Sequence, residues 1–200
     1  MQTELAFERK SRRGGRRENA GRKPNGVEAG RPHTRRQRIE RLLPVHVTVR
    51  MADHVYNLRS KRSFSIIGRA ISIAADRFGV RILEFSVQGN HMHLVVEAAA
   101  HEALSKAMQG FSIRVAKGLN AMMKRRGRVF ADRYHAHVLT TPTLARRIVL
   151  YVRNNYRKHM AQIGKPISPA YVDPFASPGA PHIEIATPRS WLLRRAAAPP

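Results

Sequence analysis

The stretch VRILEFSVQGNHMHLVV, residues 80–96, decides the fold of this chain. Its two ends, Val80–Val87 and His93–Val96, are rich in β-branched and other apolar residues, which is typical of strands. The glycine and asparagine of Gln88-Gly89-Asn90, between them, suit a tight turn. The stretch therefore predicts a β-hairpin.

The segments around the hairpin alternate between strand and helix patterns. Val45–Arg50 and Val129–Leu139 are predicted to be strands. Apolar residues recur at helical spacing over 63–78, where Gly79 suits a C-terminal cap, and over 102–124 and 144–160. The order strand, helix, strand, strand, helix, strand, with one more helix appended, predicts an α+β fold: a ferredoxin-like split βαβ sheet with helices packed on one face.

The composition changes at both ends of the predicted domain, which we place at residues 42–163. Residues 1–41 carry 13 Lys and Arg against 5 Asp and Glu, which predicts a flexible basic arm. Arg22 and Arg31 lie in short extended pieces that could enter a DNA minor groove, although a solvated tail with general affinity for phosphates explains them too. Residues 164–200 form an irregular tail rich in proline and alanine, whose apolar segment Ser190–Leu193 could dock on the domain.

The charge and the residue types limit the possible functions. A net charge of +24, from 37 Lys and Arg against 13 Asp and Glu, indicates a polyanionic partner, and nucleic acid is the first candidate. The sequence has neither a long apolar run nor an amphipathic basic helix with a wide apolar face, which argues against a membrane surface. Because cysteine is absent, a metal would need His, carboxylate or amide ligands. Without a secretory signal pattern, we expect a cytoplasmic protein, associated with the nucleoid.

Two histidines mark the start of the second hairpin strand. Because side chains alternate along a strand, His91 and His93 should point to one face, about 6 to 7 Å apart, while Met92 joins the core on the other. That separation suits two ligands of one metal ion. A His-x-His pair also arises by chance in a chain with 10 histidines.

The last predicted helix carries a polar stripe beside its apolar one. Arg147, Tyr151 and Asn155 are spaced by four residues and therefore lie along one side of the helix. Tyr151 could be a nucleophile, or a boundary residue with its ring packed and its hydroxyl in water. Tyr156 should be nearer the core, and Tyr134, between Arg133 and His135, is a weaker rival for the nucleophile.

Together these motifs resemble the HUH endonucleases, and within them the REP-associated tyrosine transposases related to single-strand insertion-sequence transposases. The resemblance covers about residues 40–160, and a trailing segment at 188–193 is similar as well. The stretches that carry it are Val45–Arg50, Gly89–Leu94, Gly127–Tyr134 and Tyr151–Asn155.

The resemblance implies a transposase that nicks and rejoins single-stranded, hairpin-forming DNA. It implies Tyr151 as the catalytic nucleophile, giving a 5′-phosphotyrosine intermediate, and His91, His93 and Asn155 as ligands of Mg²⁺ or Mn²⁺. The chain departs from the family at Tyr156, where relatives commonly have proline, and in its C-terminal segment, which is short by comparison.

Basic residues near the fourth predicted strand could bind phosphates of the DNA backbone, or could simply form a solvent-exposed face of the protein. These are Arg125, Arg126, Arg128 and Arg133. Arg147 and Arg153 flank the tyrosine, where a cation could lower its pKa. The main alternative function is a non-catalytic or domesticated nucleic-acid-binding protein of ferredoxin-like fold, and the sequence leaves open whether the protein is a monomer or a homodimer.

Overall fold

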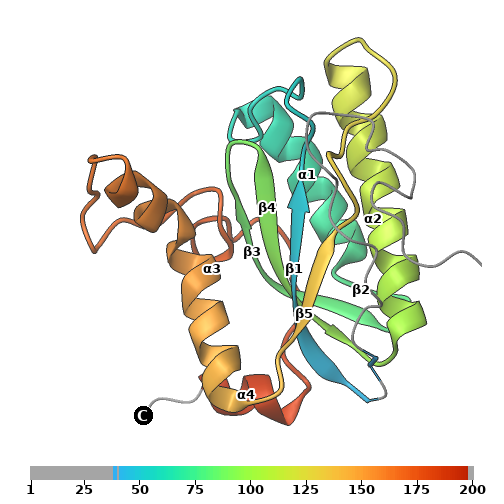
Figure 1. The fold of residues 1–200 in the computed structure, drawn as a ribbon, viewed down its shortest axis with the longest axis vertical. Coiled ribbons are helices and arrows are strands. Elements are labelled where there is room, and N and C mark those ends of the chain that lie inside the picture. The colour runs from blue at the N-terminus through green and yellow to red at the C-terminus, as the bar shows by residue number, and fades with distance from the viewer. Residues whose placement is uncertain (1–37, 40, 198–200) are drawn as a thin grey trace, which may run out of the picture. The chain divides into compact units, whose positions relative to one another are not determined.

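The computed structural model describes residues 38, 39 and 41–197 and contains one antiparallel sheet with helices on both faces (Figure 1). The strand order in the sheet is β2-β3-β4-β1-β5. The strands are β1 (Leu43–Arg50), β2 (Asp76–Arg77), β3 (Val80–Val87), β4 (His91–Ala98) and β5 (His135–Val138). The helices are α1 (Lys61–Ala74), α2 (His101–Met122), α3 (Pro142–Gln162) and α4 (Trp191–Ala197), with a 3₁₀ turn at Ser177–Gly179.

The arrangement of the four longer strands confirms the predicted ferredoxin-like fold. Helix α1 follows β1 and precedes the β3–β4 hairpin, α2 joins β4 to β5, and β1 lies between β4 and β5 in the sheet. Each of these strand pairs is antiparallel, as the split βαβ arrangement requires. All of these elements belong to one compact unit.

The two faces of the sheet are covered by different helices. Helices α1 and α2 cover one face and α3 covers the other (Figure 1). On β4, Met92, Leu94 and Val96 face the core under α1 and α2, whereas Val95 belongs to a smaller cluster with α3 and α4. The alternation of side chains along β4 therefore places His91 and His93 on the α3 face, and confirms that Met92 joins the main core.

Helices α1 and α3 begin at the caps that their sequences indicate. The side chain of Ser60 accepts a hydrogen bond from Ser63 N, and that of Thr141 accepts one from Leu144 N. Pro142 follows as the first residue of α3, where its missing N–H costs nothing. These caps fix where each helix begins relative to the sheet.

Two predicted elements were too long. The helix predicted over 63–78 ends at Ala74, because Phe78 and Gly79, with φ of 54° and 73°, form the two-residue turn between β2 and β3. Phe78 therefore lies outside the helix, and its side chain is exposed instead of packing in the core. The strand predicted over 129–139 is reduced to β5 and a single bridge between Met51 and Phe130.

The C-terminal segment is largely irregular, as predicted, but it packs closely on the domain. Backbone N–H groups of Arg189 and Ser190 donate to the buried carboxylate of Glu97 on β4. Leu192 and Leu193 are buried, which confirms the docking of this apolar segment. Among the described residues, no helix is long and apolar enough to cross a membrane.

Candidate active site

Strand register brings histidines of β1 and β4 together on the face that α3 covers. Thr48 of β1 pairs with His93 of β4, and Arg50 pairs with His91. His46, two residues before Thr48, points to the same face and stacks on His93 with 5.1 Å between ring centroids. A row of imidazoles thus crosses two neighbouring strands.

The two predicted ligand histidines lie next to each other. The ring centroids of His91 and His93 are 5.0 Å apart, with the rings nearly perpendicular. His93 is buried, and its Nδ1 lies 3.1 Å from Nε2 of His46 and 3.2 Å from the hydroxyl oxygen of Thr48. His91 is half-buried at the start of the strand.

The hydrogen-bond partners of His91 select one of its tautomers. Nδ1 of His91 lies 2.9 Å from Oδ1 of Asn90, and because an amide oxygen can only accept, His91 carries its hydrogen on Nδ1. Its Nε2 then keeps a lone pair, which is the form that binds a metal ion. The contact with Asn90 therefore leaves Nε2 of His91 with its lone pair.

The imidazoles of this row stay neutral near pH 7. Burial, followed by the nearby His137 and His135, lowers the pKa of His46 to about 4. Burial, followed by the neighbouring histidines, lowers the pKa of His93 to about 3. Burial also lowers the pKa of His91, with smaller contributions from His159 and Arg50. Metal ligation requires this neutral form.

Helix α3 places the predicted nucleophile against these rings. The Tyr151 ring meets the His93 ring edge-on, with 5.4 Å between centroids, and lies 6.1 Å from the His46 ring. The ammonium nitrogen of Lys158 is 5.5 Å from the centre of the Tyr151 ring. The structure thus places Tyr151 against His93, whose ring lies next to that of His91.

Two buried polar atoms at the site have no hydrogen-bond partner among the described residues. They are Nε2 of His93 on β4 and Oδ1 of Asn155, which is 2% exposed and lies one helical turn beyond Tyr151. An unsatisfied buried polar atom is costly, and a cation is one partner that a ring-nitrogen lone pair or an amide oxygen can bind. Two imidazoles and one amide oxygen fit a divalent cation that keeps positions for water or phosphate. In the described ranges, no group of three His, Cys, Asp or Glu side chains could hold a metal ion.

The rival tyrosine lies elsewhere. The hydroxyl oxygen of Tyr134 is 3.4 Å from that of Ser105 on α2, and its ring packs against the main core. It therefore belongs with the opposite face of the sheet from the histidine row.

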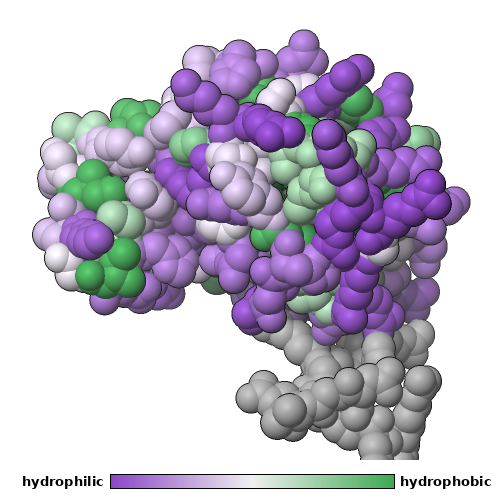
Figure 2. All heavy atoms as spheres, turned by 90° about the horizontal axis from the view of Figure 1, so that it is seen from above, coloured by the Kyte–Doolittle hydropathy of each residue, from purple (hydrophilic) through white to green (hydrophobic). Residues whose placement is uncertain are grey.

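The predicted phosphate-binding arginines differ in their placement. Arg126, Arg128 and Arg133 are exposed and Arg125 is half-buried, in the loop between α2 and β5. This loop is bound to the end of β1, where Ala131 N donates to Arg50 O, so it lies at the end of the sheet where His91 begins β4. Figure 2 shows that the surface seen from above is largely hydrophilic. Arg22 and Arg31 lie outside the described residues.

Two predictions about α3 were wrong. Arg153 does not act on the tyrosine, because its guanidinium is bound to the carboxylate of Glu84 on β3, which raises the pKa of Arg153. Tyr156 is not a core residue, because it is half-buried at a cavity. Arg147 is exposed on the helix surface.

Sequence reasoning missed two histidines of the site. His46 stands in a strand of apolar residues, and its polar side chain at an inward position was the available signal. His159 follows Asn155 by one helical turn, which extends the polar stripe of α3, and its ring centroid lies 5.7 Å from that of His91.

The fold agrees with the comparisons to known proteins. Residues 42–155 match the family model described as "Transposase IS200 like". Because the match spans more than half of the chain, the chain belongs to this family of transposases, as the sequence motifs predicted.

One solved structure shares the fold, and a second is reported beside it. A REP-associated tyrosine transposase bound to a REP hairpin matches with a TM-score of 0.55 and 17% identity, over 74% of this chain and 82% of that one. A candidate transposase from Deinococcus radiodurans R1 matches with a TM-score of 0.42 and 14% identity, over 64% of this chain and 97% of that one. No curated protein matches the sequence significantly.

Proposed function

We propose that this transposase binds single-stranded DNA beside a REP-like hairpin, and nicks and rejoins it through Tyr151. The observation that carries the proposal is the contact of the Tyr151 ring with His93, together with the unpartnered buried polar atoms of His93 and Asn155. The membership in a transposase family and the hairpin bound to the structural neighbour support DNA as the partner. The same proposal locates the protein in the cytoplasm, at the nucleoid.

In the proposed reaction Tyr151 attacks a phosphodiester. The bond from its hydroxyl oxygen to phosphorus forms, and the bond from phosphorus to the 3′-oxygen of the neighbouring nucleotide breaks. The tyrosine loses its proton to water and the 3′-oxygen takes one up, which leaves a 5′-phosphotyrosine and a free 3′-hydroxyl. Attack of a 3′-hydroxyl reverses the step, so the strand can be rejoined without ATP.

The other site residues bind and orient. His91, His93 and Asn155 would hold Mg²⁺ or Mn²⁺, which supplies positive charge to a phosphate oxygen. Asn90 holds the hydrogen of His91 at Nδ1, and His46 and Thr48 both contact Nδ1 of His93. The arginines of the α2–β5 loop would neutralise backbone phosphates of the strand, at the end of the sheet where the histidine pair lies.

A second candidate is a DNA-binding protein that has lost transposition. The net charge of +24 favours DNA binding under either proposal. The two differ in one respect, because only the enzyme forms a covalent bond with DNA.

The test is a search for that covalent bond. Purified protein is mixed with labelled single strands that carry palindromic repeats of the host genome, with Mn²⁺ or Mg²⁺, and the products are separated on a denaturing gel. We expect an adduct that chelator abolishes and that is absent from Tyr151→Phe and His91→Ala. Tyr134→Phe is the matched control and should form it normally, since Tyr134 packs on the other face. Hairpin binding without an adduct under both metals would favour the second candidate.

A further inference from the structure

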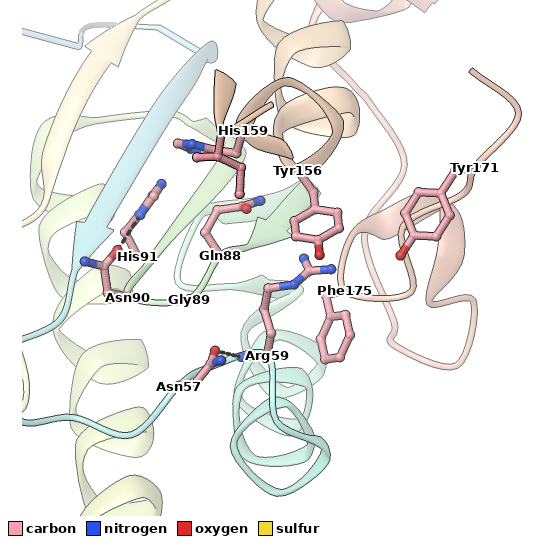
Figure 3. Close-up of a pocket in the computed structure, with 11 residues that line it drawn as sticks. Asn57, Arg59, Gln88, Gly89, Asn90, His91, Tyr156, His159, Tyr171 and Phe175 are labelled. Atoms are coloured by element: carbon pink, nitrogen blue, oxygen red, sulfur yellow. Dashed lines mark hydrogen bonds between the residues drawn. The ribbon is translucent and has the colours of Figure 1, made fainter. Parts of the chain in front are cut away.

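A cavity of about 640 Å³ opens beside the candidate active site (Figure 3). It lies between the β3–β4 turn, the C-terminal half of α3 and the irregular C-terminal segment. His91 and His159 line it as well, so one of its walls is shared with the histidine pair. A strand whose phosphate lies at His91 would therefore place a neighbouring nucleotide at this cavity.

One wall of the cavity is built from stacked planar groups. The guanidinium of Arg59 lies 3.5 Å from the ring centre of Tyr156 and 4.3 Å from that of Phe175. The Tyr171 ring, partly exposed, is 6.2 Å from the Tyr156 ring. Figure 3 shows these side chains grouped on one side of the cavity. Flat aromatic surfaces of this kind stack on nucleobases.

The charge of Arg59 is already neutralised. Its guanidinium donates two hydrogen bonds to the carboxylate of Asp173, at 2.9 and 2.8 Å, and a third to the carbonyl oxygen of Val87. Both side chains of this ion pair are nearly buried. The cavity therefore has a rigid wall with little net charge, which suits an uncharged base better than a phosphate.

Amide groups also line the cavity. Gln88 is buried, and its Nε2 donates to the hydroxyl of Ser86, which fixes the orientation of its amide. Asn57 and Asn90 are further lining residues (Figure 3). An amide offers both a donor and an acceptor, so it can hydrogen-bond to the edge of a base and distinguish one base from another.

We infer that this cavity binds one unpaired nucleobase of the DNA strand, next to the phosphate that reaches His91, and reads its identity. The inference rests on the proposed function, since it assumes a single strand at the histidine pair. An unpaired base is required, because a base within a duplex keeps its faces stacked and its pairing edge occupied. Tyr171 would stack on the base while Gln88 contacts its edge.

The test removes single bases from the DNA and single side chains from the cavity. Binding is measured by fluorescence anisotropy in the non-cleaving Tyr151→Phe protein, using strands with one abasic site at each position around the cleavage point. We expect one position at which the abasic site weakens binding about tenfold, the size of one lost stacking contact. After Tyr171→Ala, the same abasic site should weaken binding no further.

Tyr56→Ala is the matched control, because Tyr56 is an exposed tyrosine that does not line this cavity. It should preserve the tenfold effect at that position. Gln88→Met, which keeps the size of the side chain, should change the preference among the four bases there but leave the affinity for the abasic strand unchanged. An abasic effect of equal size with and without Tyr171, or no sensitive position at all, would overturn the inference.

The two proposals can fail separately. Covalent adduct formation by the unaltered protein does not depend on the abasic series. If the adduct forms but no position is coupled to Tyr171, only the base-binding inference fails. If no single strand is bound or cleaved, both proposals fail together.

Discussion

The buried carboxylate of Glu97 should hold the C-terminal segment against the sheet. It accepts hydrogen bonds from Arg189 N at 3.0 Å and Ser190 N at 2.6 Å, and it lies 3.7 Å from Nε of Arg81. Glu97→Gln replaces one acceptor oxygen with an NH₂ group that can only donate, and it removes the charge. Because a hydrogen bond to a charged group contributes about 1.5–3 kcal/mol, we expect a loss of about 3 kcal/mol from the free energy of unfolding. Arg81 keeps its ion pair with Asp76, which limits the loss.

Urea unfolding can measure this loss close to where it arises. Trp191, the sole tryptophan, directly follows Ser190 and reports on the docked segment by fluorescence, while far-UV circular dichroism reports on the whole domain. With a slope of about 2 kcal/mol per molar urea, the Trp191 midpoint should fall by about 1.5 M. The control is Glu102→Gln, which removes an exposed carboxylate from the first turn of α2 and should shift the midpoint little. Equal midpoints for the two variants would refute the reasoning.

Three further predictions concern pH, the attachment of α3 and DNA affinity. Burial lowers the pKa of His46 from 6.5 to about 4, so the contribution of this imidazole to the free energy of unfolding should be constant above pH 6.5 and fall by up to about 3 kcal/mol as the pH falls from 6.5 to 4. Urea titrations of His46→Gln should show a smaller fall, and an unchanged fall would assign it to other groups. A double-mutant cycle of Glu84→Gln and Arg153→Met should give a coupling of about 1 kcal/mol in the free energy of unfolding, because Arg153 is partly exposed. A coupling of zero would mean that this ion pair does not stabilise the packing of α3 on β3. Arg126→Gln and Arg128→Gln should each lower the slope of log affinity against log salt by about one, and an unchanged slope would remove that residue from the DNA interface.

Periodicity was sufficient to predict most of the fold. The apolar spacing over 102–124 predicted α2 to within two residues at either end, because one side of a long helix faces a continuous core. The strand predicted over 129–139 failed for the opposite reason. The first half of this segment contacts the end of β1 through only a few hydrogen bonds, and the side chain of Asp132 accepts a hydrogen bond from Arg133 N. The residues there therefore form no continuous ladder with β1, although their types favour a strand.

The C-terminal segment shows what the sequence could not reveal. Its position depends on polar contacts with distant residues, such as Asp173 with Arg59 and Ser177 with Glu84. No periodicity marks such contacts, because each involves one side chain and a partner about a hundred residues away. Tyr156 was assigned to the core for a related reason: it lies beside the apolar stripe of α3, but the surface that it meets there is the guanidinium of Arg59.

The alternation that predicted the histidine pair also explains why the site lies under α3. On β4 the even-numbered side chains from Met92 to Ala98 fill the main core, so the odd-numbered ones must face the other way. That second face carries His93 and Glu97, both buried and polar, which could not be tolerated without partners. Glu97 finds its partners in the C-terminal segment, whereas Nε2 of His93 finds none among the described residues. The difference between these two residues of one strand separates a structural contact from the site at which we propose that a cation binds.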